Sequence, residues 1–144
     1  MKNNIFNFNL KELNKFAYTF CQNLNLSDIV LLKGDLGSGK TTLARYIINN
    51  VYLLNKLKKP RIIPSPSFPI LQTYKVKNFD IFHYDFYRII KINEIKEIGF
   101  EENIQKNISL IEWPEIIMPM IKEYNKKTIT LSIIDNKHRK LVIN

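Results

Sequence analysis

The sequence predicts an α/β fold in which a mixed β-sheet is flanked by helices and ends in a C-terminal β-hairpin. Residues 28–33 form a compact apolar stretch typical of a buried strand. A glycine-rich turn at 34–41 joins this strand to residues 41–54, whose apolar positions recur at the three and four spacing of a helix. Two further strand-like stretches, 70–76 and 80–86, are separated by only three residues, as in an antiparallel hairpin.

Length and composition indicate a single soluble domain. A chain of 144 residues is long enough for one core, so residues 1–144 are expected to form one domain. No apolar run reaches the ~20 residues of a membrane span, and asparagines interrupt residues 1–9, so no signal peptide is expected. The single cysteine, Cys21, allows no internal disulfide and lies in an apolar helical pattern that favours packing. We therefore expect a cytoplasmic protein.

The net charge of +9 is compatible with a nucleic acid as binding partner but does not require one. The excess consists almost entirely of lysine, since the chain has only four arginines. Asparagine, isoleucine, lysine, phenylalanine and tyrosine are also abundant along the whole sequence, as in a general compositional bias. Solvated lysines are therefore favoured over direct RNA binding, which stays open.

The first part of the chain is expected to form a strand and a helix. Residues 5–9 alternate in the manner of a short strand, and residues 10–24 carry apolar side chains at helical spacing. Asn9 is placed to cap this helix, with Glu12 three residues later as its partner in a capping box.

Residues 34–41 match the pattern G-x-x-x-x-G-K-[ST] at every position. Gly34 and Gly39 allow backbone angles at which successive N–H groups turn inward around a phosphate. Lys40 supplies a mobile charge for phosphate oxygens, and Thr41 offers a hydroxyl to Mg²⁺ at a helix N-terminus. The alternative is a glycine-rich turn without a ligand. Because a strand precedes the motif and a helix follows it, the sequence predicts a P-loop NTPase-like domain that binds a nucleotide.

Two loop segments follow the predicted P-loop helix. Residues 55–61 are basic and end near a proline, and an exposed loop is favoured there over a contact to RNA or to an acidic partner. Residues 62–69 contain three prolines, so they cannot form a continuous hydrogen-bonded ladder. Ser65 and Ser67 are candidates for a loop that senses the γ-phosphate, and a plain proline-rich turn is an equal alternative.

The strand 80–86 brings a carboxylate to its end. Asp85 is a candidate for orienting water or Mg²⁺ near the phosphates, and an ion pair with Arg88 is the alternative. His83 lies two residues earlier and is expected on the same face of the strand. A structural role is its default interpretation.

A second candidate acid follows a short helix. Residues 92–100 resemble an amphipathic helix with Gly99 as its glycine cap. The apolar stretch 104–113 contains Glu112 at its end, where a Walker B acid would reach Mg²⁺ beside the P-loop threonine. A solvated strand end is the alternative for this acid. Trp113 could cover a nucleotide, but packing in the core is favoured. At the C-terminus, two strand-like stretches, 128–134 and 139–143, predict a hairpin.

The chain resembles the TsaE (YjeE) family of small bacterial ATPases in four motifs that occur in the order and spacing of that family. These motifs are residues 34–42, 65–68, 83–88 and 111–115. Ser67 stands where the family usually has threonine, and Phe86 where it commonly has leucine. The C-terminal hairpin matches the family only loosely.

The resemblance implies a Mg²⁺-dependent ATPase that is needed for making threonylcarbamoyladenosine beside the anticodon of tRNA. Its implied partners are a TsaB–TsaD pair, which its ATP hydrolysis would reset, and tRNA would be contacted through that complex. Carried over by motif, the residues that bind the ATP phosphates are Asp35, Leu36, Gly37, Ser38, Gly39, Lys40, Thr41 and Thr42. Thr41 and Glu112 would hold Mg²⁺, and Lys40, Asp85 and Glu112 would act in catalysis. Residues 65–68 would form the switch loop.

Hydrolysis by the chain alone is expected to be slow, because the sequence offers one lysine, one metal site and no evident arginine finger in the loop. Three alternative functions fit the sequence less well. A GTP switch needs an Asn-Lys-x-Asp base reader, and residues 125–128 lack its acid. A small nucleotide or nucleoside kinase needs a lid with several arginines. An RNA-binding module would leave the P-loop unexplained.

Overall fold

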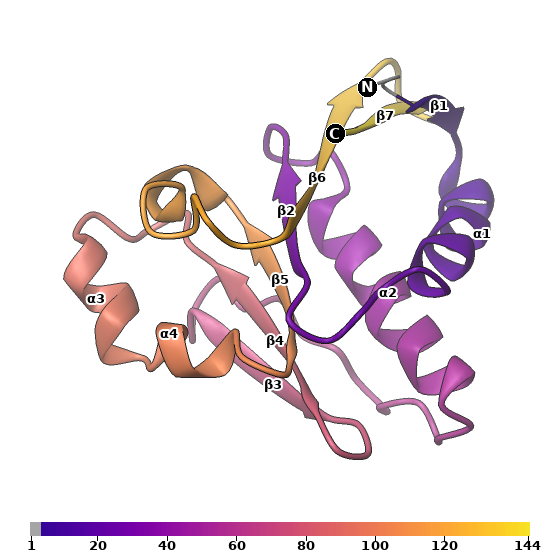
Figure 1. The fold of residues 1–144 in the computed structure, drawn as a ribbon. Helices are drawn as coiled ribbons and strands as arrows, with labels where there is room; N and C mark the ends of the chain where they lie inside the picture. The colour runs from indigo at the N-terminus through magenta and orange to yellow at the C-terminus, as the bar shows by residue number, and fades with distance from the viewer. Residues whose placement is uncertain (1–3) are drawn as a thin grey trace.

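A computed structural model describes residues 4–144 as a seven-stranded mixed sheet with helices on both faces (Figure 1). The strands are β1 (Asn4–Phe8), β2 (Ile29–Lys33), β3 (Leu71–Lys75), β4 (Asp80–Asp85), β5 (Ile108–Glu112), β6 (Lys126–Ile133) and β7 (Arg139–Ile143). The helices are α1 (Leu10–Cys21), α2 (Lys40–Leu54), α3 (Ile92–Glu97), α4 (Phe100–Asn103) and the 3₁₀ helix η1 (Pro114–Ile117). Residues 1–3, which belong to the stretch 1–9 predicted to contain no signal peptide, lie outside the described residues.

The sheet has the order β1-β7-β6-β2-β5-β4-β3, with β2 at its centre. Strand β2 pairs in parallel with β5 and β6, and β4 pairs in parallel with β5. The other neighbours are antiparallel, which confirms the predicted β3–β4 and C-terminal hairpins. The sequence did not predict that β1 pairs with β7 and so brings the first and last strands together. The predicted α/β fold is confirmed.

The two faces of the sheet pack into separate apolar cores because side chains alternate along β2. Val30 and Leu32 pack with the residues of α1 and α2, whereas Ile29 and Leu31 pack with those of α3, α4 and η1. All four are fully buried. Figure 1 shows α1 and α2 on one side of the sheet and α3 and α4 on the other. The carboxyl ends of β2, β4 and β5 therefore meet at one edge, between these layers.

The predicted capping box of the first helix is present. Asn9 Oδ1 accepts from the backbone N–H groups of Lys11 (3.0 Å) and Glu12 (3.2 Å), and Asn9 N–H donates to Glu12 Oε2 (2.8 Å). At the other end of α1, Cys21 is buried, and burial raises the pKa of its thiol to about 12. The packing role expected for Cys21 is confirmed.

The structure shortens two predicted elements. Helix α3 ends at Glu97, before Gly99, which adopts a positive φ of 72° and leads directly into α4. The predicted strand 104–113 begins only at Ile108, because Ile104 follows α4 and is buried in the core beside it.

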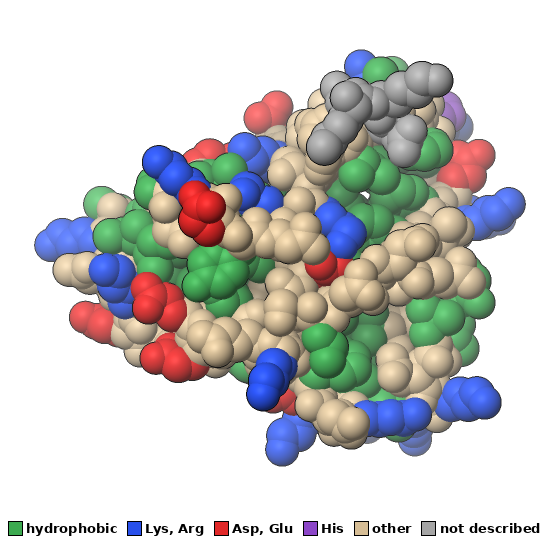
Figure 2. Space-filling view, in the orientation of Figure 1, with side chains coloured by type: hydrophobic (Ala, Val, Ile, Leu, Met, Phe, Trp, Pro, Cys, Tyr) green, Lys and Arg blue, Asp and Glu red, His purple; other side chains and the backbone are tan. Residues whose placement is uncertain are grey.

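The basic connector after α2 is exposed, as expected. Lys56, Lys58, Lys59 and Arg61 are all exposed, and no carboxylate of the described residues forms an ion pair with them. Figure 2 shows lysine and arginine side chains scattered over the visible face, many of them near its outline, with no single dense patch. Among residues 4–144, no helix combines the length and the apolarity that crossing a bilayer would demand.

Gly34, directly after β2, should tolerate no side chain. Its φ is +140°, and a Cβ there would lie 2.3 Å from the Leu131 carbonyl oxygen and 2.7 Å from Ser38 Oγ. Gly34→Ala is expected to lower the free energy of unfolding by roughly 3 kcal/mol, from backbone strain and overpacking. Urea denaturation measures this loss.

Gly37→Ala is the matched control. Gly37 also has a positive φ, +75°, but a Cβ there would meet nothing within 4 Å. We therefore expect a smaller loss, of about 1 kcal/mol from the backbone alone. Equal losses in the two variants would show that the close approach to Leu131 is not what requires glycine at position 34.

Candidate nucleotide-binding site

The glycine-rich loop connects the carboxyl end of β2 to the first turn of α2. Gly39 is the N-cap of this 15-residue helix, has a left-handed φ of 107°, and leaves the helix without a side-chain cap. The first-turn N–H groups are therefore free to bind an anion, which the helix dipole also favours. Ser38 is fully buried, and its Oγ has no hydrogen-bond partner among the described residues. The loop thus offers several polar groups that no other part of the described chain satisfies.

The Lys40 ammonium lies inside the bend of the loop. Its Nζ donates to the carbonyl oxygens of Gly34 (2.6 Å) and Asp35 (2.9 Å). Burial lowers the pKa of Lys40, and the nearby carboxylates, Glu112 above all, act in the opposite direction. The lysine therefore brings a positive charge to the loop at a place where solvent screens it poorly.

Thr41 and Glu112 meet although 71 residues separate them in sequence. The Thr41 hydroxyl donates to Glu112 Oε2 at 2.8 Å. The parallel pairing of β2 with β5 sets Glu112 opposite Leu32, at the end of β2 from which the loop departs. A hydroxyl and a carboxylate are thus adjacent at the start of α2, as the predicted magnesium site requires.

The buried side chain of His83 contacts the other oxygen of the same carboxylate. His83 Nε2 lies 2.8 Å from Glu112 Oε1, and both residues are almost completely buried. His83 Nδ1 has no hydrogen-bond partner among the described residues. This contact was not predicted from the sequence.

Asp85 is hydrogen-bonded to the proline-rich loop, residues 62–69. Its Oδ2 accepts from the Ser67 hydroxyl (2.8 Å), and its Oδ1 accepts from the Tyr87 N–H (2.9 Å). Ser65 Oγ lies 2.8 Å from Ser67 Oγ and extends this chain of polar groups. The alternative ion pair between Asp85 and Arg88 is not formed in the described structure. The Arg88 guanidinium instead lies 5.4 Å from the centre of the Phe68 ring.

Trp113 lines the site, so the preference for packing in the core was wrong. Its backbone has a positive φ of 54°, which turns the chain directly after Glu112. Lys40 Nζ lies 4.1 Å from the centroid of the half-buried Trp113 ring. The centroids of the Trp113 and Tyr87 rings are 4.8 Å apart. A cation over an indole face is a favourable contact, so Trp113 covers the lysine.

The P-loop, Ser67, Asp85, Glu112 and Trp113 surround one cavity of ≈ 230 Å³, which His83 and Ser38 do not line. Of the predicted site residues, Lys40, Thr41, Asp85 and Glu112 all line it. The remaining residues of the loop that border it are Leu36, Gly37, Gly39 and Thr42. Asp35 is exposed at the outside of the loop. The structure thus brings together side chains from α2, β4 and β5 that were predicted from the sequence to form one site.

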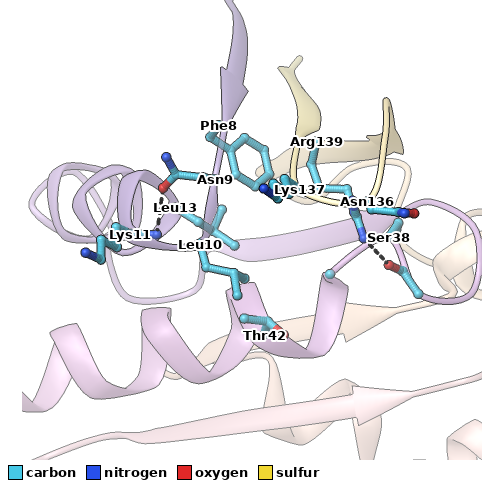
Figure 3. Close-up of a pocket in the computed structure, with 12 residues that line it drawn as sticks. Phe8, Asn9, Leu10, Lys11, Leu13, Ser38, Thr42, Asn136, Lys137 and Arg139 are labelled. Atoms are coloured by element: carbon cyan, nitrogen blue, oxygen red, sulfur yellow. Dashed lines mark hydrogen bonds between the residues drawn. The ribbon is translucent and has the colours of Figure 1, made fainter.

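A second and larger cavity, of ≈ 590 Å³, adjoins the loop and shares Gly37, Gly39 and Thr42 with the first. It lies between the start of α1 and the β6–β7 turn, as Figure 3 shows. Its other walls are Ser38 of the loop, the apolar Phe8, Leu10 and Leu13, and the polar Asn9, Lys11, Asn136, Lys137 and Arg139. Arg139 also donates to the Gly37 carbonyl oxygen (3.3 Å) and so links the hairpin to the loop. This cavity was not predicted from the sequence, because most of its walls come from the two ends of the chain.

The sequence is similar to that of a known protein family over most of its length. The model of the family described as "Threonylcarbamoyl adenosine biosynthesis protein TsaE" matches residues 8–141. A protein of Rickettsia typhi named "tRNA threonylcarbamoyladenosine biosynthesis protein TsaE" is 47% identical over 134 residues, which cover 90% of this chain and 85% of the relative. A protein of Borreliella burgdorferi with the same name is 28% identical over 126 residues, or 86% of this chain and 87% of that protein.

Among solved structures, the crystal structure of YdiB from Bacillus subtilis superposes with a TM-score of 0.67. The match covers 99% of this chain and 86% of that one at 20% sequence identity. This similarity supports the fold described above.

Proposed function

The chain belongs to the TsaE family of threonylcarbamoyl adenosine biosynthesis proteins, and we propose that it is a Mg²⁺-dependent ATPase acting in the threonylcarbamoyladenosine modification of tRNA. The observation that carries this proposal is the contact between the Thr41 hydroxyl and the Glu112 carboxylate beside the P-loop. A hydroxyl and an acid at this position are the protein ligands of magnesium in P-loop ATPases.

The loop would bind the triphosphate through main-chain and ammonium donors. The free N–H groups at the start of α2 would point at phosphate oxygens. Lys40 would exchange its two carbonyl contacts for phosphate oxygens, which are stronger acceptors for an ammonium. Because Lys40 is buried, its charge would act on the phosphates with little screening.

The donors present fit Mg²⁺ that arrives with the nucleotide. Residues 4–144 contain no group of three or more histidine, cysteine, aspartate or glutamate side chains that could hold a metal ion alone. Mg²⁺ commonly takes one or two protein oxygens and completes its shell with phosphates and water, so Thr41 and Glu112 would suffice. When bound, the ion would neutralise charge on the phosphates.

Asp85 would orient the attacking water. Its carboxylate lines the phosphate cavity, and contacts from Ser67 and Tyr87 hold it in place. Because Ser67 belongs to the proline-rich loop, movement of that loop would change the position of Asp85. This coupling supports a switch role for residues 65–68.

The nucleoside would occupy the second cavity. The apolar side chains of Phe8, Leu10 and Leu13 suit the face of a base, and Asn9 and Asn136 could bond its edge. The position of residues 125–128 argues against a guanine reader there, since Lys126 pairs with Ile29 at the beginning of β2 and the P-loop follows its other end. ATP is therefore favoured over GTP.

Hydrolysis by the chain alone should be slow. No arginine lines the phosphate cavity within the described residues, and supply of an arginine in trans is a common means of acceleration.

Large apolar side chains are exposed in the P-loop, in the proline-rich loop and after β4, at Leu36 (66%), Phe68 (85%) and Ile90 (86%). Such residues suit a protein partner, and a TsaB–TsaD-like pair is the partner we propose. Contact with tRNA would pass through that complex, in the cytoplasm.

Phosphate release by the purified chain, with and without Mg²⁺, tests this function. We expect slow, Mg²⁺-dependent hydrolysis of ATP that a TsaB–TsaD pair accelerates. Competition with GTP tests the base, and a pull-down with ATP and with ADP tests the partner. Turnover of about ten per second by the chain alone, or the transfer of labelled γ-phosphate to an acceptor other than water, would contradict the proposal.

A further inference from the structure

His83 is a buried polar side chain to which the function proposed above gives no role. It lies on β4 and is 0% exposed. Its Nε2 bonds Glu112, but its Nδ1 has no partner among the described residues. An unsatisfied buried polar atom costs free energy, and an apolar residue of similar size would avoid that cost. Packing alone therefore does not explain a histidine at this position.

The sheet register directs His83 toward Glu112. Strands β4 and β5 are parallel, with Asp85 opposite Glu112 and His83 opposite Leu110. Because alternate residues of a strand face the same side, His83 and Asp85 both face the site. His83 reaches Glu112 from the interior of the sheet, whereas Thr41 reaches it from α2.

The two contacts use different oxygens of one carboxylate. Thr41 donates to Oε2 at 2.8 Å, and His83 lies 2.8 Å from Oε1. The His83 tautomer with its proton on Nε2 would donate to Oε1, because an ionised carboxylate can only accept hydrogen bonds. With one oxygen held from the interior, rotation of the carboxylate is restricted and its other oxygen stays toward Thr41.

We propose that His83 is a positioning residue that orients Glu112 for Mg²⁺ before the ion binds. The inference rests on the proposed function, since it concerns the same Mg²⁺ site. Hydrogen-bond partners of metal ligands commonly contribute 10–100-fold to metal affinity. His83 would act on Mg²⁺ affinity only through Glu112.

Measurement of Mg²⁺ affinity with bound ADP tests this role without hydrolysis. His83→Leu removes the donor, and His83→Gln places an amide N–H near the position of Nε2. We expect His83→Leu to weaken the apparent Mg²⁺ affinity about 10-fold and His83→Gln to restore most of it. The affinity for ADP in EDTA should be unchanged in both variants, because Glu112 then contributes little. Isothermal titration calorimetry measures all these affinities.

His138→Leu is the control, since His138 is the only other histidine of the chain and lies exposed beside Asp135. It should leave Mg²⁺ affinity unchanged. A His83→Leu variant that binds Mg²⁺ as tightly as the wild type would overturn the positioning role. So would a loss of ADP affinity that is equal in both His83 variants and the same with and without Mg²⁺. If wild-type protein binds ADP equally well with and without Mg²⁺, the proposed metal site itself is wrong. The wild-type measurement therefore distinguishes an error in the proposed metal site from an error in the role proposed for His83.

Discussion

Replacement of Lys40 by alanine is expected to lower the rate of ATP hydrolysis by about 100-fold or more. The variant removes the only ammonium inside the loop, where burial keeps its charge effective. ATP binding should weaken about 10-fold, as expected for the loss of a charged hydrogen bond. Phosphate release and ATP titration measure the two effects.

Lys75→Ala is the matched control for this variant. Lys75 is an exposed lysine on β3, away from the loop, so its loss changes the net charge equally. It should leave hydrolysis and binding unchanged. Circular dichroism should show that both variants are folded. Hydrolysis by Lys40→Ala at the wild-type rate would contradict the role assigned to this lysine.

Replacement of Glu112 by glutamine should have an effect of similar size on hydrolysis, about 100-fold or more. The amide keeps the size of the side chain and an oxygen for a hydrogen bond, but it removes the negative charge that Mg²⁺ requires. ATP binding in EDTA should change little, so the loss appears only when the metal is present. Phosphate release over a series of Mg²⁺ concentrations measures this difference.

Glu115→Gln controls for the loss of a negative charge near the loop. Glu115 lies in η1, three residues after Glu112, and is exposed. The control should hydrolyse ATP like the wild type. If both variants lose the same activity, general electrostatics and not metal binding explains the effect of Glu112.

The central part of the fold was predictable because its signals are local. The strand–loop–helix unit from β2 to α2 follows from a short apolar run, a glycine pattern and a helical repeat within 27 consecutive residues, 28–54. The capping box at Asn9 was predictable for the same reason, since its partner is three residues away. The link between Thr41 and Glu112 was foreseen only because the P-loop motif requires an acid at a neighbouring strand end.

Two other features depend on strand pairing and could not be predicted from local signals. The bond between His83 and Glu112 needs the pairing of β4 with β5, and a lone histidine gives no sign of its partner. The second cavity needs the pairing of β1 with β7, which brings residues near both termini to the loop. The position of Trp113 depends on a positive φ that is uncommon for a bulky residue.

The indole of Trp113 gives the protein an internal optical signal. Trp113 is the only tryptophan of the chain, so selective excitation of indole reports from this one place. The ring lies against the Lys40 ammonium, and its emission should change when that cation moves toward an incoming anion. Binding and release of unlabelled nucleotide could then be followed in real time by stopped-flow fluorescence, without a dye or an engineered probe.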